Sequence, residues 1–322
     1  MLDETDKKIL YELGKNARLS YSQISKEIKS KKPIVAYHVQ NLEKKGVIWK
    51  YVPVISLSRL GIYAYKIYFR FHGLGKEKKK ELIGEFVKDE HINWVAESIG
   101  VWDLLISIYA KNIMEFAIRK NKIFEKYGSF IQDYSITVLE DALVFNRDYL
   151  VKKSINYRKE FVFGGKIEIE EIDDKQKKIL RLIRNNGRFS LLDIAKKTNL
   201  NVGTIQSKIK DLEKRGIIQG YTTFINLNKT NLKFFKLCIH IHKYGKKEFT
   251  ELLNYCKANK NVLHLIKSIG DWELEIELES DDLDSVYEFV NELKTKFPNT
   301  IKKIDLVIIK NEIKLDFFPE WY

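Results

Sequence analysis

Cysteine is scarce in this sequence, with only Cys238 and Cys256 among 322 residues. Two cysteines in no paired spacing provide neither a disulfide framework nor a zinc site by themselves, so we expect both to be buried thiols. No apolar run reaches the roughly 18 to 20 residues that a membrane span requires. The opening segment MLDETDKKIL also has no apolar core of a signal peptide. These absences predict a cytoplasmic protein that makes no membrane contact.

Signatures of catalysis are missing as well. The sequence has no Ser/His/Asp arrangement, no phosphate-binding glycine loop and no metal-ligand cluster that stands out. We therefore predict that the protein is not an enzyme and that it holds no cofactor and no metal. Disorder is not expected, because 44% of the residues are hydrophobic and 12% are aromatic.

Acidic residues are in short supply in two segments of the chain. The formal net charge is +13. Residues 1–50 hold 11 Lys and Arg against 6 Asp and Glu, and residues 171–220 hold 12 against 6. Most of the excess positive charge therefore lies in these two segments, which makes them the candidate polyanion-binding modules.

The chain repeats itself at an offset of 170 residues. SIGVWDLLISI, which begins at Ser98, matches SIGDWELEIEL, which begins at Ser268. In the same register LDETDKKIL lies over IDDKQKKIL, and NLEKKGVIWKY lies over DLEKRGIIQGY. One offset kept over separate landmarks indicates a tandem duplication. The copies are joined through VKKSINYRKEFVFGGKIEIE, in which Gly164–Gly165 is the expected flexible point.

The first fifty residues of each copy predict three short helices and a strand. In copy one, Ser20 is a plausible N-cap before YSQISKEIK, and the segment PIVAYHVQNLEKKG begins at Pro33. Copy two repeats the order with Ser190, LLDIAKKTN and VGTIQSKIKDLEKRG. VIWKYVPVI and IIQGYTTFI then alternate as strands, and we expect each to form a wing. Three helices with a β-wing are the winged helix-turn-helix pattern.

The rest of each copy follows the order strand, helix, strand, strand, helix, strand. This order, which begins with YAYKIYFRF in copy one and KFFKLCIHIH in copy two, predicts a ferredoxin-like βαββαβ unit. The fold class is therefore α+β, with two winged helix-turn-helix domains alternating with two ferredoxin-like domains. The expected boundaries are residues 1–52 and 53–150 for copy one, 151–171 for the linker, and 172–222 and 223–322 for copy two.

At this point the sequence resembles the Lrp/AsnC family of transcription regulators. The matching features are the opening LDETDKKIL, the helix ends LEKKGVI and LEKRGII, and the Gly-x-x-Asp turn from Gly100 to Asp103. The resemblance covers nearly the whole chain, once per copy, and implies RAM-type ferredoxin-like domains and double-stranded DNA as the partner. Such proteins usually carry one copy and pair into dimers, so it also implies an intramolecular pseudo-dimer. Assembly into a higher homo-oligomer is left open.

The two copies depart from the family pattern in different ways. The recognition-helix position that is often Arg is His38 in copy one and Lys208 in copy two. Leu60–Gly61 becomes Thr230–Asn231, and Asp103 becomes Glu273. We therefore expect the DNA preferences and effector pockets of the halves to differ, or one of them to be lost.

The third helix of each helix-turn-helix is the one expected to enter the major groove. Its polar side chains would contact base edges, and flanking lysines would contact phosphates. The alternative is that these residues are the solvated face of a surface helix. The predicted DNA-binding residues are Lys31, Lys32, Tyr37, His38, Asn41 and Lys44 in copy one, and Asn201, Thr204, Gln206, Ser207, Lys208 and Lys210 in copy two. Apolar positions expected in the core are Ile34, Val35, Val39, Leu42, Ile205, Ile209 and Leu212.

The resemblance also implies a small effector, often an amino acid, between the paired sheets. A carboxylate at the Gly-x-x-Asp turn would hold an α-ammonium, and backbone N–H groups freed by glycine would hold an α-carboxylate. The alternative is that glycine only permits the turn and that the carboxylate only caps it. The implied effector-binding residues are Gly100, Trp102 and Asp103 in copy one and Gly270, Trp272 and Glu273 in copy two.

Alternation along the strands gives each sheet a polar open face. In copy one Tyr68, Arg70 and His72 point away from the helices. We predict that the two open faces lie against each other, with Arg70 and histidines offsetting a row of glutamates. The corresponding residues of copy two are Cys238, His240 and His242, together with Glu275, Glu277 and Glu279.

Cysteine, histidine and glutamate on one face are also usable zinc ligands. Alternate positions on a strand, however, place side chains roughly 7 Å apart, which suits a shared metal site poorly. We therefore favour no metal.

Alternative functions stay open at this point. Siroheme decarboxylases resemble the same pair of folds, but the stretch HINWVAESIGVWDLL offers only His91, Asn93 and Trp94 of the residues expected of them. An architectural DNA-binding protein, or a partner that no longer binds DNA, would also fit. The segment DFFPEWY is expected to be an exposed aromatic tail that docks on a sheet.

Overall fold

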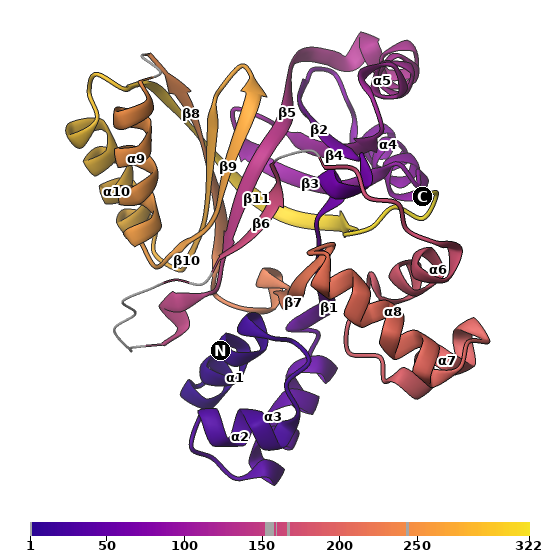
Figure 1. Ribbon diagram of the computed structural model, residues 1–322. Helices are drawn as coiled ribbons and strands as arrows, with labels where there is room; N and C mark the ends of the chain where they lie inside the picture. Colours follow the sequence, from indigo (N-terminus) through magenta and orange to yellow (C-terminus); the bar gives the residue numbers. More distant parts are fainter. Residues whose placement is uncertain (1, 152–157, 159, 166–167, 243–244) are drawn as a thin grey trace.

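Two three-helix units lie at one end of the molecule in the computed structural model (Figure 1). The structure describes residues 2–151, 158, 160–165, 168–242 and 245–322. The first unit contains α1 (Glu4–Lys15), α2 (Tyr21–Glu27) and α3 (Lys32–Lys44). The second unit contains α6 (Asp174–Ile183), α7 (Leu191–Thr198) and α8 (Val202–Lys214). The predicted three-helix order is confirmed in both copies.

Local capping residues explain where these helices begin. The side chains of Asp3, Ser20, Asp173 and Ser190 each accept a backbone N–H of the first helical turn, and each forms a reciprocal capping box. A cap of this kind stabilises a short helix by about 1 kcal/mol, because it satisfies donors that the helix itself leaves free. The sequence therefore fixes four of the six helix starts locally.

The strand after each helix-turn-helix pairs with its counterpart in the other copy. β1 (Ile48–Ile55) runs antiparallel to β7 (Ile218–Ile225) in a two-stranded ribbon. The prediction of strands is confirmed, but the prediction that each would form its own wing is wrong. Strands with free edges lower their free energy by pairing, and the duplicated chain supplies an equivalent strand from its own second half.

Reciprocal contacts lock the two helix-turn-helix units together. Arg18 donates to the carbonyl of Gly187 at 2.7 Å and lies 4.0 Å from the ring of Tyr221. Arg188, the equivalent of Arg18, lies 4.9 Å from the ring of Tyr51. Side chains of both units also belong to one apolar core. The two units are therefore held in a fixed relation by residues that the duplication provides twice.

Each ferredoxin-like unit has the predicted order. Copy one contains β2 (Tyr63–Phe71), α4 (Lys76–Lys88), β3 (Ile92–Gly100), β4 (Leu104–Ala110), α5 (Ile113–Tyr127) and β5 (Ile131–Phe145). Copy two contains β8 (Lys233–Ile241), α9 (Lys246–Ala258), β9 (Val262–Gly270), β10 (Leu274–Ser280), α10 (Leu283–Lys296) and β11 (Ile301–Leu315). Short 3-10 turns occupy Leu57–Leu60, Gly128–Phe130, Asp148–Leu150 and Leu227–Lys229. None of the helices described is both long and apolar enough to span a bilayer.

The two long strands β5 and β11 join the sheets into one closed system. The first part of β5 pairs with β2 of its own copy, and the last part pairs with β9 of the other. β11 likewise pairs first with β8 and then with β3. The strand order is β2-β4-β3-β11-β8-β10-β9-β5, and β5 returns to β2. The helices pack outside, so the polar faces of both sheets are turned toward a common interior (Figure 1).

The linker contains a strand where flexible chain was expected. β6 (Glu160–Gly164) pairs with β5, and the N–H of Gly165 donates to the carbonyl of Glu140 at 2.8 Å. The Gly164–Gly165 pair is therefore held by backbone hydrogen bonds, which corrects its assignment as the flexible point. Both glycines have positive φ, +85° and +82°, a region that other residues rarely adopt.

The aromatic tail is also packed rather than exposed. Phe318 is fully buried in the core of the helix-turn-helix units. Trp321 stacks on His91 with ring centroids 4.8 Å apart, and Arg184 donates to the side chain of Glu320 at 2.9 Å. The end of the chain thus fastens α6 of copy two to the ferredoxin-like unit of copy one.

Substitution of the two linker glycines by alanine tests why the chain uses them. A Cβ at Gly164 would lie 2.6 Å from Leu139 and 2.8 Å from the carbonyl oxygen of Glu140, whereas at Gly165 the nearest atoms are 3.9 Å away. We expect Gly165→Ala to cost about 1–2 kcal/mol from backbone strain alone, and Gly164→Ala to cost clearly more. Urea unfolding of both variants measures the difference, and equal costs would show that the close approach is unimportant.

Candidate nucleic-acid interface and central cavity

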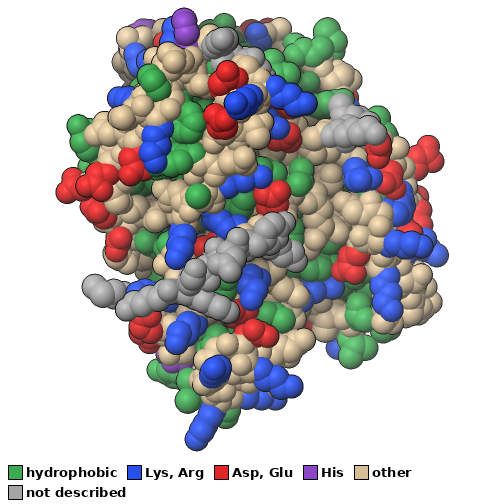
Figure 2. Space-filling view, turned by 60° about the vertical axis from the view of Figure 1, so that its left-hand side comes forward, with side chains coloured by type: hydrophobic (Ala, Val, Ile, Leu, Met, Phe, Trp, Pro, Cys, Tyr) green, Lys and Arg blue, Asp and Glu red, His purple; other side chains and the backbone are tan. Residues whose placement is uncertain are grey.

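The exposed side chains of α3 and α8 form the candidate DNA-binding surface. Tyr37 is 66% exposed, and most of the other predicted DNA-binding residues are also exposed. Asn41 and Thr204 are partly buried. The exposed members are Lys31, Lys32, Tyr37, Lys44, Asn201, Gln206, Ser207 and Lys210. In Figure 2 Lys and Arg side chains gather at the lower end of the molecule, where Figure 1 places the first unit.

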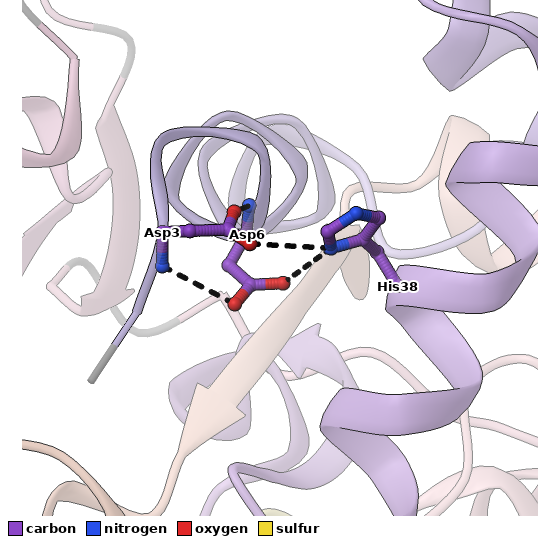
Figure 3. A group of neighbouring side chains, drawn as sticks. All are labelled: Asp3, Asp6 and His38. Atoms are coloured by element: carbon purple, nitrogen blue, oxygen red, sulfur yellow. Dashed lines mark hydrogen bonds and ion pairs between the residues drawn. The ribbon is translucent and has the colours of Figure 1, made fainter.

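His38 does not lie on the outward face of α3. Its Nδ1 lies 2.8 Å from Oδ1 of Asp6 and 3.8 Å from Oδ2 of Asp3, and only 17% of its side chain is exposed. Figure 3 shows the imidazole turned toward the start of α1, with one ring nitrogen facing both carboxylates. His38 thus links α3 to α1, which corrects its assignment as a base-contacting residue.

Lys208, the equivalent residue of copy two, also contacts a carboxylate at the start of the first helix of its unit. Lys208 Nζ lies 2.5 Å from Oδ2 of Asp173, the counterpart of Asp3. Asp3, Asp6 and His38 are close enough to hold a metal ion. Because copy two places an ammonium where copy one places the imidazole, we interpret both clusters as ion pairs between helices. Lys208 therefore also has a partner inside the protein.

Two further side chains of the recognition helices differ from their predicted roles. Asn201 accepts the N–H of Thr204 at 2.7 Å and so acts as the N-cap of α8. Ile34, expected in the core, is 43% exposed. Ile34 occupies the position of Thr204 in the other copy, so this surface position is apolar in one half and polar in the other. The other six apolar positions are buried as predicted, namely Val35, Val39, Leu42, Ile205, Ile209 and Leu212.

The carboxylates of the Gly-x-x-Asp turns hold the turns in place. Asp103 accepts the backbone N–H of Phe71 at 2.8 Å, and Glu273 accepts that of Ile241 at 2.8 Å. Gly100 has φ +121°, and a Cβ there would lie 2.8 Å from the carbonyl oxygen of Leu306. These contacts support the capping interpretation. Trp102 and Trp272 are buried between the sheets, beside the same turns.

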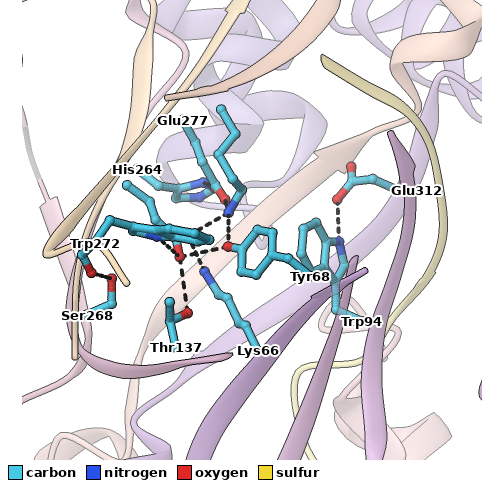
Figure 4. A network of polar contacts seen from close by, with 11 residues as sticks. Lys66, Tyr68, Trp94, Thr137, His264, Ser268, Trp272, Glu277 and Glu312 are labelled. Atoms are coloured by element: carbon cyan, nitrogen blue, oxygen red, sulfur yellow. Dashed lines mark hydrogen bonds and ion pairs between the residues drawn. The ribbon is translucent and has the colours of Figure 1, made fainter. Parts of the chain in front are cut away.

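A buried carboxylate, Glu275, is the centre of the interior between the sheets. Its Oε2 lies 2.6 Å from Nζ of Lys66 and 2.6 Å from Nζ of Lys236, and its Oε1 accepts the hydroxyl of Tyr68 at 2.7 Å. Trp272 donates to the same oxygen at 3.2 Å (Figure 4). Residues of both copies therefore bind one carboxylate, which confirms that the polar sheet faces lie against each other.

The other glutamates of β10 have separate partners. Glu277 contacts Lys236 at 2.6 Å and His264 at 2.5 Å. Glu279 receives two hydrogen bonds of 2.9 Å from the guanidinium of Arg147. The prediction that Arg70 and His240 would offset these charges is wrong, and the histidine that contacts a glutamate of β10 is His264 of β9. Arg70 donates to the carbonyl of Val101, and His240 pairs with Asp305.

The shared ion pairs control protonation in this interior. Burial alone would raise the pKa of Glu275, but the ammonium groups of Lys236 and Lys66 outweigh it and lower the pKa to about 2. Burial lowers the pKa of Lys66, which has one carboxylate partner. The pKa of Lys236 is raised in spite of burial, because Lys236 has two such partners. Cys238 is a fully buried thiol with its pKa raised by burial, and His240, which was considered with it as a zinc ligand, contacts Asp305 at 2.9 Å.

A cavity of about 170 Å³ lies where the two sheets meet the β1–β7 ribbon. Glu312 of β11 lines it, and its Oε1 accepts the indole N–H of Trp94 at 2.9 Å (Figure 4). Burial raises the pKa of Glu312 to about 7, and the nearby carboxylates of Glu277 and Glu279 add to the rise. Asn93 also lines the cavity, and its buried Oδ1 has no hydrogen-bond partner among the residues that the structure describes.

Sequence reasoning missed most of the residues that neutralise the interior. Lys66 and Lys236 are equivalent in the two copies, and strand alternation places them on the same face as Tyr68 and Cys238. That signal was available, because an unexplained lysine recurs at the same strand position in both copies. His264 of β9, Arg147 just after β5 and Glu312 of β11 carry no such signal, because none of them recurs at the equivalent position of the other copy.

Each half of the chain is similar to known helix-turn-helix regulators. A winged helix-turn-helix DNA-binding family model matches residues 2–48 and 172–219. An HTH-type transcriptional regulator of Pyrococcus furiosus is 31% identical over 148 residues, which is 45% of this chain and 99% of that protein. A solved AsnC family transcriptional regulator of Agrobacterium tumefaciens is 18% identical with a TM-score of 0.41, over 46% of this chain and 95% of its own.

The fold is shared along almost the whole chain with another protein. Two structures of the siroheme decarboxylase NirDL, one with an iron-uroporphyrin III analogue, cover 97% and 99% of this chain. They cover 93% and 95% of their own chains, with TM-scores of 0.61 and 0.62. The identity is 14% in both cases, so this likeness concerns the fold alone.

Replacement of each interior lysine by methionine tests the charge network. Lys236→Met removes the ammonium that Glu275 and Glu277 share, so we expect a loss of about 3–5 kcal/mol in the free energy of unfolding at pH 7. Lys66→Met should cost less, because Glu275 keeps Lys236. Urea unfolding gives both values. A larger loss for Lys66→Met would contradict the assignment of Lys236 as the shared cation.

Glu312→Gln tests the raised pKa of that carboxyl. A pKa of about 7 in the folded protein means that folding favours the protonated carboxyl group. The stability that Glu312 contributes to the folded protein is therefore fully present below pH 4.5 and is lost as pH rises through 7. Glutamine cannot ionise, so we expect the free energy of unfolding of the variant, relative to that of the original protein, to rise by roughly 2–3 kcal/mol from pH 5 to pH 8. Urea unfolding at several pH values measures this difference, and a difference that does not change with pH would show an ordinary pKa.

Proposed function

The chain belongs to the Lrp/AsnC family of DNA-binding transcriptional regulators and carries the family's unit twice, and we propose that it acts as a single-chain pseudo-dimer on a two-part DNA site. The observation that carries the proposal is the β1–β7 ribbon, which joins the two helix-turn-helix units. Arg18 and Arg188 add reciprocal contacts between the units. A fixed relation between two recognition helices is what recognition of two half-sites requires.

Different side chains would bind the DNA phosphates and recognise the bases. Lys31, Lys32, Lys44 and Lys210 are exposed cations suited to phosphates, which give affinity without sequence preference. Base edges would be contacted from α3 and α8 in the major groove. The candidates for base contacts are Tyr37 and Asn41 in copy one and Thr204, Gln206 and Ser207 in copy two. Because these sets differ, the two half-sites should form an imperfect palindrome, about one helical turn or a multiple of it apart.

An amino-acid effector at the Gly-x-x-Asp turns stays a separate proposal. Asp103 and Glu273 each already accept one backbone N–H, so an effector would have to use their remaining capacity. Melting curves and DNA affinity measured with a panel of amino acids test this. If neither quantity changes, the two carboxylates serve the turns alone.

An enzyme of the siroheme decarboxylase type is the second candidate, favoured by the fold shared along the whole chain. The central cavity opposes it, because 170 Å³ is below the range of about 300–1,000 Å³ typical of sites for drug-sized ligands, and a tetrapyrrole is larger still. Titration with a metalloporphyrin tests the alternative. A Soret band that saturates with protein would support the enzyme, and its absence would leave the regulator.

Selection from a random-duplex pool across a salt series tests the regulator directly. We expect affinity to fall steeply with salt and the surviving duplexes to carry two spaced, different half-sites. Salt dependence without enrichment would indicate an architectural DNA-binding protein. Failure to bind any duplex would reject the proposed function.

Paired lysine variants test the location of the interface. Lys31→Ala with Lys32→Ala removes two cations from α3, so we expect a several-fold to tenfold weaker affinity and a salt slope smaller by about 2. Lys76→Ala with Lys80→Ala removes the same charge from exposed positions of α4, on the far side of the sheets (Figure 1). This control should change affinity little. Equal effects of the two double variants would show that only net charge matters.

A further inference from the structure

The central cavity has mainly apolar walls contributed by both copies. Val52 and Val54 of β1 and Phe224 of β7 form the side toward the helix-turn-helix units. Ala142 and Val144 of β5 continue the apolar surface. An engineered protein cavity of about 150 Å³ with apolar walls binds benzene, so about 170 Å³ accommodates a body the size of one aromatic ring.

The cations at the cavity wall are already neutralised by protein carboxylates. Lys66 pairs with Glu275, His264 pairs with Glu277, and Arg147 binds Glu279 through two hydrogen bonds. A bound anion would therefore have to compete with an intramolecular partner for each of them. The wall offers no cation with free capacity among the lining residues described.

Two hydrogen-bond acceptors at the cavity wall can still accept further hydrogen bonds. Glu312 contacts only the indole N–H of Trp94 among the described residues, and no cation pairs with it there. The buried Oδ1 of Asn93 has no hydrogen-bond partner in the described part of the chain. Buried acceptors without donors are costly, and a buried carboxylate without a cation more so. Both features point to a missing partner that donates hydrogen bonds and carries positive charge.

We propose that this cavity binds a small primary amine whose apolar body is about one ring in size and whose ammonium group meets Glu312 and Asn93. The aromatic and aliphatic walls would cover the body, while the ammonium would donate to the two free acceptors. An α-amino acid fits less well, because its carboxylate would find no free cation. This site differs from the Gly-x-x-Asp turns, and ligand binding to it can be measured without DNA, so its outcome is independent of the proposed function.

Calorimetric titration of the full-length protein with 2-phenylethylamine at pH 7.5 tests the proposal. We expect one site per chain, with affinity at least tenfold higher than for phenylalanine and for ethylbenzene. Phenylalanine adds a carboxylate to the same body, and ethylbenzene removes the ammonium. Equal binding of ethylbenzene would overturn the role of the carboxylate, and absence of amine binding would overturn the site.

Three variants place the binding within the cavity. Glu312→Gln keeps an acceptor for Trp94 but removes the charge, so amine affinity should fall at least tenfold. Ala142→Met places three more heavy atoms against the cavity and should weaken all ligands, whether or not the ammonium partner is intact. Glu288→Gln changes an exposed glutamate of α10 and should have no effect. If Glu288→Gln weakens binding as much as Glu312→Gln does, the amine binds to surface charge and the proposal fails.

Discussion

The crossing of β5 and β11 between the copies is the constraint on which the rest of the molecule depends. Each strand begins in its own sheet and ends along the edge strand of the other, so neither sheet can separate without breaking main-chain hydrogen bonds. The closure turns two open polar faces into one interior. Lysines, glutamates and tryptophans that would be ordinary on a wet surface are therefore buried, and each charge needs a partner.

Much of the fold follows from local sequence patterns, because these record what each residue does within its own element. The 170-residue repeat, the N-cap signals at Ser20 and Ser190 and the strand alternation predicted the helices, the strands and the facing sheets. Pairing between the copies did not follow. The alternating strands IWKYVPVI and IQGYTTFI show that one face is buried, but they do not show which strand lies beside them. The assumed wings and the flexible Gly164–Gly165 both failed for this reason.

Site residues were harder to predict where a side chain on one helix contacts another element of the protein and not the solvent. His38 lies on a recognition helix, so its position indicates DNA, but Asp6 of α1 is within hydrogen-bonding distance. The polarity pattern of α3 alone does not reveal that neighbour. Asn201 is a similar case, since its amide serves the first turn of α8. Lys31, Lys32, Lys44 and Lys210 have no comparable contact among the described residues, so the prediction that they bind DNA stays a prediction.

The charges of the interior also explain why the two halves pair with each other. Both copies carry the lysine, as Lys66 and Lys236, but only copy two carries the glutamates, at positions where copy one has Leu105, Ser107 and Tyr109. A pair of two first halves would bury two ammonium groups without carboxylates. A pair of two second halves would bury six glutamates without Arg147 to bind Glu279. Only the mixed pair is balanced, so the mismatch favours pairing of a first half with a second half by penalising pairs of like halves.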